Sequence, residues 1–245
     1  MKTALITGAN KSIGLETARQ ILQAGYFVYL GSRDLKKGRE AADKLRSEGL
    51  TNVEAIAIDI SDPESIKSAR KELGGKRQSL DVLINNAGIR GSVPQNPATV
   101  DVNVIREVFD TNFFGTIAIT QAFLDLLKAS EAPRIVNVTS GLASLTLHND
   151  PGWKYYNVKG GVYGPSKTAL NAYTIALAYE LRDTAFKINA VDPGFTATDF
   201  NQHRGTGTVN DAAARVVKYA LIGADGPTGG FFSDDNNPET GISPW

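Results

Sequence analysis

Short apolar runs alternate with longer segments of helical period along the chain, and this alternation limits the folds that the chain can adopt. Ala4-Leu5-Ile6 is followed by a helical pattern from Ile13 to Leu22. Further strand-length runs lie at 27–30, 53–58, 82–84, 135–138 and 188–191, and helices are expected at 37–48, 62–73, 102–128 and 164–182. The runs are continuously apolar, which indicates a parallel sheet covered on both faces. The predicted fold class is therefore α/β, a doubly wound and mostly seven-stranded parallel sheet.

Composition predicts one domain and excludes several kinds of site. The 245 residues contain no Pro/Gly/Ser-rich linker, so a single domain over 1–245 is expected, with loops and one short strand near 230–232 at the C-terminal end. Lysine plus arginine (26) balance aspartate plus glutamate (26), which favours a small-molecule partner over nucleic acid or a membrane. The chain has no cysteine and only His148 and His203, so no metal site is predicted. The N-terminal apolar run is too short for a signal-peptide core, and a cytoplasmic protein is expected.

A glycine-bearing turn follows the first predicted strand and opens the first helix. It reads Thr7-Gly8-Ala9-Asn10-Lys11-Ser12-Ile13-Gly14. Such a turn lets backbone N–H groups approach a pyrophosphate, and the helix N-terminus adds favourable partial charge. An ordinary tight turn between strand and helix is the alternative interpretation. Its position after the first strand of an α/β chain favours dinucleotide binding in a Rossmann-type fold.

The residues after the second strand bear on which dinucleotide binds. The chain reads Gly31-Ser32-Arg33-Asp34, so a serine stands where an acid would accept hydrogen bonds from a ribose 2′-OH. Arg33 can instead hold a 2′-phosphate, and Lys11 can reach the same group, which favours NADPH/NADP over NADH. In the alternative interpretation both cations are solvated and Asp34 is the ribose ligand.

Polar and small residues also follow the later strands. They are Asp59-Ile60, Asn85-Asn86-Ala87-Gly88, Thr139-Ser140 and Asp192-Pro193-Gly194. Taken singly, such residues are common in turns. Their repetition at successive strand ends indicates a ligand site along the carboxyl edge of the sheet.

These motifs together resemble the short-chain dehydrogenase/reductase family over nearly the whole chain. The resemblance rests on the turn at Thr7–Gly14 (the family's TGxxxGxG), on Asn85–Gly88 (NNAG), on Asn112 in Thr111–Gly115, on Ser140, on a YxxxK and on Pro193-Gly194. Within the family, the segments TGANKSIG, GSRD, NNAG, NFFG and DPGFTATD are most similar to the NADPH-dependent carbonyl reductases. One departure is Ser12, which replaces the middle glycine; we expect cofactor binding to survive it.

The resemblance also implies the residues of the site. The catalytic set would be Asn112, Ser140, Tyr163 and Lys167. The cofactor would be bound by Gly8, Asn10, Lys11, Ser12, Ile13, Gly14, Arg33, Asp59, Ile60, Asn85, Ala87, Gly88, Tyr163, Lys167, Pro193, Gly194, Thr196 and Thr198.

The YxxxK pattern occurs twice, at Tyr155/Lys159 and at Tyr163/Lys167. A tyrosine that donates a proton at neutral pH needs a nearby ammonium to lower its pKa, hence a lysine one turn away on a real helix. Lys159 precedes two glycines, whereas Lys167 begins a helical stripe of Ala169, Tyr173, Leu177 and Leu181. The second copy is therefore predicted to be catalytic. Tyr155 and Tyr156 either pack in a surface loop or line the substrate pocket.

Choosing the second copy lengthens the spacing from Ser140 to Tyr163 beyond what is usual in the family. The excess predicts an insertion near 147–161, and similarity to carbonyl reductases with such an insertion favours a monomer or a small homo-oligomer. The segment Phe195–Thr208 is predicted to be a substrate lid. The sequence does not indicate which carbonyl compound binds.

The resulting hypothesis is reversible hydride transfer between NADP(H) and a ketone, aldehyde or secondary alcohol. Tyr163 is the general acid, Lys167 lowers its pKa and holds the nicotinamide ribose, and Ser140 bonds the carbonyl. Asn112 anchors a water that relays protons through Lys167. Two alternatives stay open: an NAD-dependent alcohol dehydrogenase of the same family, and a nucleotide-sensing protein without catalysis.

Overall fold

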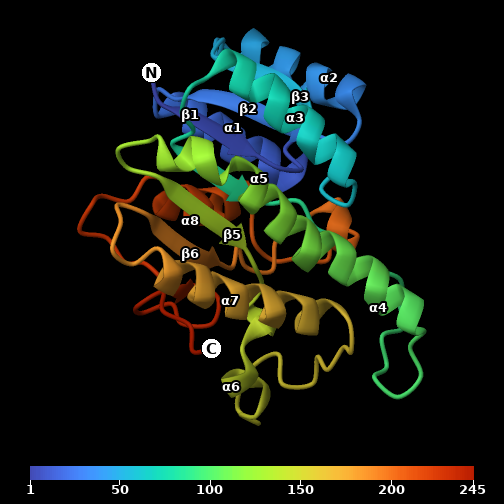
Figure 1. Ribbon diagram of the computed structural model, residues 1–245. Helices are drawn as coiled ribbons and strands as arrows, with labels where there is room; N and C mark the ends of the chain where they lie inside the picture. The colour runs from blue at the N-terminus through green and yellow to red at the C-terminus, as the bar shows by residue number, and fades with distance from the viewer.

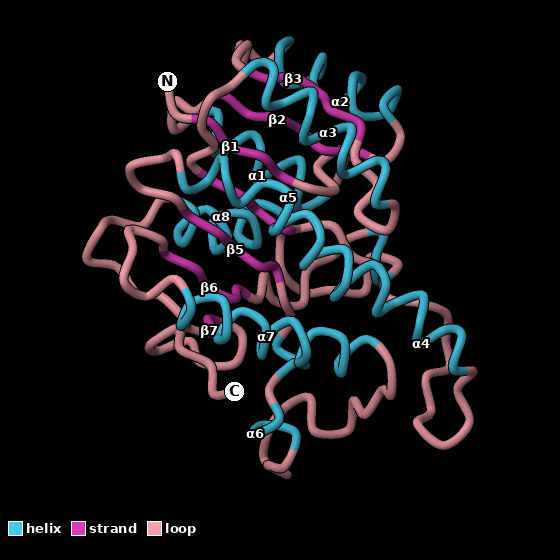
Figure 2. Tube along the Cα trace, viewed as in Figure 1, coloured by secondary structure: helices cyan, strands magenta, loops and turns pink.

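Seven strands form a single sheet in which every pairing is parallel (Figures 1 and 2). This is a computed structural model that describes the whole chain, residues 1–245. The strands are β1 (Thr3–Ile6), β2 (Phe27–Ser32), β3 (Val53–Ala57), β4 (Val82–Asn85), β5 (Arg134–Val138), β6 (Lys187–Val191) and β7 (Phe231–Phe232). Their order is β3-β2-β1-β4-β5-β6-β7. The predicted doubly wound, seven-stranded sheet is confirmed.

Helices cover both faces of the sheet (Figure 1). On one face lie α1 (Ser12–Gln23), α2 (Leu35–Ser47) and α8 (Val209–Ala220), and on the other lie α3 (Pro63–Lys76), α5 (Thr116–Lys128) and α7 (Tyr163–Glu180). Each face has its own cluster of buried apolar residues, and both the strands and the helices of that face contribute to it. Because the chain order reverses between β1 and β4, the crevice that such sheets use for ligands lies at the carboxyl ends of these strands.

The predicted helix at 102–128 is interrupted. It consists of α4 (Val102–Phe109), a π-helical turn at Asp110–Gly115 and α5. Single π-helical turns inside α-helices occur frequently at functional sites, and this one contains Asn112. Periodicity could not reveal the turn, because one turn of wider helix changes the spacing of apolar residues very little.

The buried face of α7 differs from the predicted stripe. Leu177 and Leu181 are buried as expected, but Ala169 and Tyr173 are only partly buried. The polar residues Asn171 and Thr174 are buried instead. The reason is that polar strand residues face them: Thr139 Oγ1 donates to Asn171 Oδ1 (2.8 Å), and Asn137 Nδ2 donates to Thr174 Oγ1 (2.9 Å).

Side chains cap the starts of α2, α3, α4 and α8. Asp34, Asp62, Asp101 and Thr208 accept backbone N–H groups at the starts of α2, α3, α4 and α8. No side chain caps α1, which starts in the glycine-bearing turn. Its first N–H groups therefore have no side-chain acceptor within the chain.

The C-terminal segment returns to the carboxyl edge of the sheet, beside the short helix α6 (Leu145–His148) (Figure 1). The carbonyl oxygen of Trp245 accepts from the backbone N–H of Thr146 (2.9 Å), and its ring packs on Phe231 at 5.5 Å between centroids. The expected short strand near 230–232 is present as β7. No helix in the structure combines the length and apolar character needed to cross a membrane.

Candidate active site

The turns that follow β1 and β4 are held tightly together. A Cβ on Gly8 would lie 2.9 Å from the Cα of Ala87, so only glycine fits there, and its φ of +62° is also one that glycine favours. Asn86 Nδ2 donates to the carbonyl oxygens of Thr7 and Gly8, both at 3.0 Å. Sequence reasoning did not single out Asn86, whose side chain closes the turn rather than facing solvent.

Ser12 adopts the left-handed backbone conformation, with φ of +50°. This explains why the family has glycine at the matching position, and the chain tolerates serine there at a cost of about 1 kcal/mol. Gly14 follows in the first turn of α1, where a Cβ would lie 2.5 Å from the oxygen of Gly8. The compact turn and the uncapped start of α1 fit a pyrophosphate, with Asn10, Lys11 and Ile13 in the same segment.

A cavity of about 440 Å³ lies beyond this turn, at the ends of β2 and β3. Its lining includes Arg33, Ile60, Ser61, Ile89 and Thr111. The lining combines apolar side chains with the cation of Arg33, and the acids Glu107 and Asp110 also contribute to it.

The acidic residue after β2, Asp34, already has hydrogen-bond partners within the chain. The carboxylate of Asp34 accepts the backbone N–H groups of Lys36 and Lys37 at the start of α2 (3.0 and 3.2 Å). Ser32 Oγ donates to the carbonyl oxygen of Asp34 (2.8 Å). This arrangement disfavours the alternative in which Asp34 binds the ribose.

Asp59 and Lys11 have partners of their own. A hydrogen bond from Ser61 Oγ, at 2.6 Å, lowers the pKa of Asp59, and the charge of Arg33 lowers it further. Lys11 Nζ lies 2.8 Å from Asp199 Oδ2 in the predicted lid, and both side chains are exposed. Lys11 thus connects the turn after β1 to the segment predicted to be a lid.

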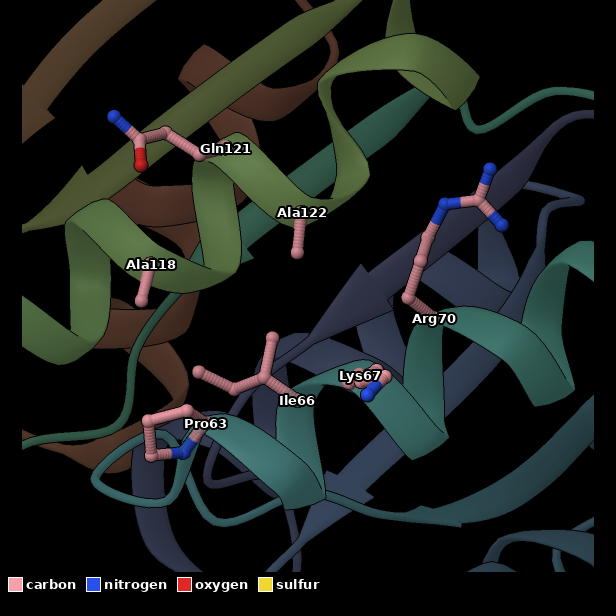
Figure 3. A pocket seen from close by; sticks show the side chains of 7 residues that line it. All are labelled: Pro63, Ile66, Lys67, Arg70, Ala118, Gln121 and Ala122. Atoms are coloured by element: carbon pink, nitrogen blue, oxygen red, sulfur yellow. The ribbon is translucent and has the colours of Figure 1, made fainter.

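A second cavity, of about 490 Å³, lies between α3 and α5 (Figure 3). Ile66, Ala118 and Ala122 point into it, and it shares Pro63, Ile66 and Ala118 with the first cavity. None of its lining residues belongs to the predicted catalytic or cofactor-binding sets, whereas Arg33 and Ile60 of the cofactor-binding set line the first cavity. The larger cavity is therefore not the one at the candidate site.

Asn112 links three parts of the site. Its Oδ1 accepts the backbone N–H of Ile89 (2.8 Å), and its Nδ2 donates to the Ile89 carbonyl (2.9 Å) and to Ser166 Oγ in α7 (3.0 Å). A Cβ on Gly88 would lie 3.1 Å from Asn112 Oδ1 and 3.5 Å from Lys167 Nζ. The side chains of Asn112 and Lys167 therefore border the same glycine. By contrast, the Asn85 amide is used inside the core, where it donates to Thr120 and Asn137.

Tyr163 is the first residue of α7, as predicted, and its neighbours are Ser140 and Lys167. Its phenol lies near enough to Ser140 for the serine side chain to lower the phenol pKa. Lys167 Nζ lies 5.9 Å from the centre of the phenol ring and donates to the carbonyl oxygen of Val138 (2.8 Å). The structure thus brings together the three side chains that the sequence predicted, from the end of β5 and from α7.

Burial shifts the pKa values of Tyr163 and Lys167. Burial, and then the charge of Asp192, raise the pKa of Tyr163, while the side chain of Ser140 lowers it. Burial lowers the pKa of Lys167 to about 8. The sequence led us to expect that Lys167 lowers the phenol pKa. In the structure the Lys167 ammonium donates to the Val138 carbonyl, and its expected effect on the phenol pKa stays a prediction.

The first YxxxK copy lies in turns between 151 and 162, without a helix. Tyr155 donates from its hydroxyl to Asp235 Oδ2 (2.7 Å), and its ring lies 6.4 Å from that of Phe195. Lys159 does not pair with Tyr155; its Nζ lies over the ring of Tyr156, 4.1 Å from the centroid. The prediction that this copy lies on a loop is confirmed.

The segment after β6 crosses the site. Pro193 and Gly194 turn the chain, with Gly194 at φ of +83°. Thr196 Oγ1 donates to the Gly194 carbonyl (3.1 Å), and Thr198 precedes a short 3-10 turn at Asp199–Asn201.

Two contacts of Tyr163 were not foreseen. The ring of Phe200, in that 3-10 turn, lies 5.3 Å from the ring of Tyr163. Gln95 Oε1 accepts the backbone N–H of Tyr163 at 3.2 Å, and so replaces the missing cap of α7. Neither residue carries a sequence signal, because each acts through a contact between loops far apart in the chain.

The fold and the convergence of these side chains define a dinucleotide-binding α/β protein with a tyrosine, a lysine and a serine at the carboxyl edge of its sheet. The family model described as short chain dehydrogenase matches residues 2–208. The (+)-neomenthol dehydrogenase of Capsicum annuum is 32% identical, with 94% of each chain covered. The chain therefore belongs to the short-chain dehydrogenase family, a family of oxidoreductases.

Solved structures agree with this assignment. The structure of salutaridine reductase from Papaver somniferum is similar with a TM-score of 0.83 at 29% identity, covering 96% of this chain and 100% of that one. An NADPH-bound carbonyl reductase from chicken fatty liver is similar with a TM-score of 0.84 at 26% identity, covering 100% of this chain and 99% of that one.

Proposed function

We propose that this protein is an NADPH-dependent carbonyl reductase that transfers hydride reversibly between NADP(H) and a ketone or aldehyde. The observation that carries the proposal is the convergence of Tyr163 and Lys167 in the first turns of α7, with Lys167 Nζ 5.9 Å from the centre of the Tyr163 ring and Ser140 beside the phenol. These side chains lie at the same sheet edge as the uncapped start of α1. The relatives named as dehydrogenases and reductases of ketone or alcohol compounds support it.

In this proposal each side chain has one task. NADPH, when bound, supplies the hydride. Ser140 holds the carbonyl oxygen by a hydrogen bond, and Tyr163 gives that oxygen a proton from Oη. The raised pKa of Tyr163 keeps the phenol protonated before the reaction, which suits a proton donor. Lys167 binds the nicotinamide ribose, and Asn112 holds a water through which protons return to Tyr163.

The preference for NADPH rests on the charges at the end of β2. Arg33 lines the cavity at the ends of β2 and β3, while the Asp34 carboxylate is engaged as a helix cap. A 2′-phosphate would gain a charged hydrogen bond from Arg33, whereas the Asp34 carboxylate is not free to accept from a ribose 2′-OH. The chicken carbonyl reductase, solved with NADPH, supports the same choice.

The cofactor proposal is tested by comparing kcat/KM with NADPH and NADH over a panel of ketones and aldehydes. The unmodified protein should prefer NADPH. Arg33→Asp should lower kcat/KM for NADPH at least about tenfold, the value of one charged hydrogen bond, and should leave NADH unchanged or improved. Arg39→Asp, an exposed cation of α2 outside the cavity, is the matched control. A preference for NADH in the unmodified protein would refute the assignment.

The catalytic proposal is tested with the two tyrosines of the repeated pattern. Tyr163→Phe removes the proton donor, so turnover should fall at least about a thousandfold, within the range of a general acid, while NADPH binding measured by fluorescence persists. Tyr155→Phe loses only a hydrogen bond to Asp235 and should retain most of its activity. Similar losses in both variants would show that Tyr163 has no special role.

A further inference from the structure

One carboxylate of the C-terminal segment binds two consecutive side chains of the predicted insertion. Asp235 Oδ2 accepts from the hydroxyl of Tyr155 (2.7 Å), and Asp235 Oδ1 accepts from Lys154 Nζ (2.7 Å). The Lys154 side chain is about half exposed, so solvent weakens the ion pair, whereas Tyr155 is partly buried. The bond from Tyr155 is therefore the stronger of the two connections between Asp235 and the insertion.

The next residue of the C-terminal segment connects the insertion to the loop of Ser140. Asn236 Oδ1 accepts from the indole N–H of Trp153 (3.3 Å), and Asn236 Nδ2 donates to the carbonyl oxygen of Gly141 (3.3 Å), which follows Ser140. Trp153 is buried, and its ring lies 5.4 Å from that of Tyr155, edge to face. The insertion is thus held beside a loop of the candidate active site.

Tyr155 in turn contacts the base of the predicted lid. Its ring lies 6.4 Å from that of Phe195, in the edge-to-face arrangement that aromatic pairs favour. A Cβ on Gly194, which precedes Phe195, would lie 3.6 Å from the Cβ of Asp235. The Phe195 carbonyl oxygen accepts the backbone N–H of Gly207 (2.9 Å), so Phe195 lies where the two ends of the lid meet. Asp235 therefore reaches the base of the lid directly and through Tyr155.

The lid carries two aromatic rings that the protein itself covers only in part. Phe195 is 42% exposed and Phe200 is 41% exposed. The ring of Phe200 lies 5.3 Å from that of the catalytic candidate Tyr163, and the ring of Phe195 contacts Tyr155. Exposed apolar side chains gathered beside a catalytic centre are typical of a site for an apolar ligand. An apolar ring on the substrate is the group that would cover them.

We propose that the substrate is a carbonyl compound that carries an apolar ring, and that Asp235 is a positioning residue for its binding. This inference rests on the proposed function and names the substrate class of the same site. Asp235 holds the hydroxyl of Tyr155, the Tyr155 ring holds Phe195, and Phe195 packs on the substrate ring. Asp235 itself contacts neither the substrate nor the cofactor.

The experiment measures kcat and KM with NADPH for three ketones. Cyclohexanone carries an apolar ring, tetrahydropyranone has the same ring with an ether oxygen in place of one methylene, and butanone has no ring. The unmodified protein should favour cyclohexanone over each of the others in kcat/KM by at least about fivefold, the value of one or two buried methylene groups.

Replacing Asp235 by alanine should change the binding of the ring and not the chemical step. In Asp235→Ala, KM for cyclohexanone should rise about three- to tenfold, the value of one aromatic contact, while kcat and KM for butanone change less than about twofold. Each ketone is compared with itself, so its intrinsic reactivity cancels. A merely structural role would lower kcat for all three ketones alike.

Further variants separate the two bonds of Asp235. Asp235→Asn keeps an acceptor for Tyr155, and Lys154→Met removes only the ion pair, so both should leave KM for cyclohexanone within about twofold. Tyr155→Phe should raise that KM and retain kcat, and adding it to Asp235→Ala should change nothing more, because the two residues act through one bond. Glu239→Ala, at an exposed acid of the same segment, is the matched control. Tyr155→Phe replaces Asp235→Ala if that variant does not fold.

Hydrogen exchange of the cofactor-free proteins tests the positioning of the lid without turnover. In the structure the backbone N–H of Ala197, inside the lid, donates to the Gly207 carbonyl (3.1 Å). Asp235→Ala should speed the exchange of this amide about threefold or more, because the base of the lid loses its support. Glu239→Ala should leave it unchanged.

The outcomes separate this inference from the proposed function. An unchanged KM for cyclohexanone or unchanged lid exchange in Asp235→Ala, or equal changes in Glu239→Ala, overturns the role of Asp235. Equal kcat/KM for the three ketones in the unmodified protein overturns the substrate class. No turnover of any ketone, aldehyde or alcohol overturns the proposed function, and lid exchange then still decides whether Asp235 positions the lid.

Discussion

Replacing Lys167 by methionine should make the protein more stable at neutral pH while it removes activity. Lys167 is 4% exposed, and burial lowers its pKa from 10.5 to about 8. A shift of this size corresponds to roughly 3 kcal/mol of unfavourable free energy for keeping the ammonium buried and charged below pH 8. Methionine has nearly the same shape and no charge. It loses the bond to the Val138 carbonyl, which costs about 1 kcal/mol, so a net gain of about 2 kcal/mol is expected.

The difference in stability between Lys167→Met and the unmodified protein should also change with pH in a definite direction. Between the folded pKa, about 8, and the ordinary value of 10.5, the unfolded state binds the proton more strongly. The destabilisation by Lys167 is therefore complete below the folded pKa, shrinks as pH rises through this window, and is gone above it. The advantage of Lys167→Met should shrink over the same window, since the methionine protein lacks this titration.

Thermal unfolding of the cofactor-free proteins measures the effect. A gain of about 2 kcal/mol corresponds to roughly 4–8 °C in Tm for a domain of this size. Lys71→Met, the same change at an exposed lysine of α3, should alter stability by less than about 0.5 kcal/mol. A Lys167→Met protein less stable than the unmodified one at neutral pH, or a difference that stays constant with pH, would refute the reasoning.

Two further predictions follow from close contacts at the site. Gly14→Ala places a Cβ 2.5 Å from the Gly8 oxygen, so it should destabilise the protein by about 1–3 kcal/mol in chemical denaturation and weaken NADPH binding; unchanged stability would mean that the turn opens freely. Phe200→Ala removes the ring 5.3 Å from that of Tyr163, so KM for the carbonyl compound should rise roughly two- to tenfold, the value of one aromatic pair, with stability little changed. An unchanged KM in that variant would show that Phe200 does not cover the substrate.

The residues that follow the strands could be assigned to one site from the sequence, because the fold makes these residues neighbours. Once strands of a parallel sheet are recognised, the residues that follow each of them must meet at one edge. This is why Gly8, Gly88, Ser140 and Tyr163, more than 150 positions apart at the extremes, could be assigned to one site. The second YxxxK copy could also be chosen from the sequence, because glycines and the spacing of apolar residues are features of a few consecutive turns.

Contacts between loops were not predictable in the same way. Gln95 caps α7 from a loop 68 positions earlier, and the Lys11–Asp199 pair joins segments 188 positions apart. No periodicity relates such residues. Their meeting depends on how each loop leaves its strand, which side-chain packing decides.

The sequence by itself determined the sheet, its covering helices, the family and the identity of the tyrosine, lysine and serine at the site, because these follow from periodicity, turn chemistry and motifs at strand ends. Only the tertiary structure decided the electrostatics of that site. It buried Lys167, directed its ammonium at the Val138 carbonyl, and left Tyr163 half-buried beside Ser140. The physical reason is that a pKa depends on burial and on charges brought near by folding, and neither is a property of a residue's neighbours along the chain.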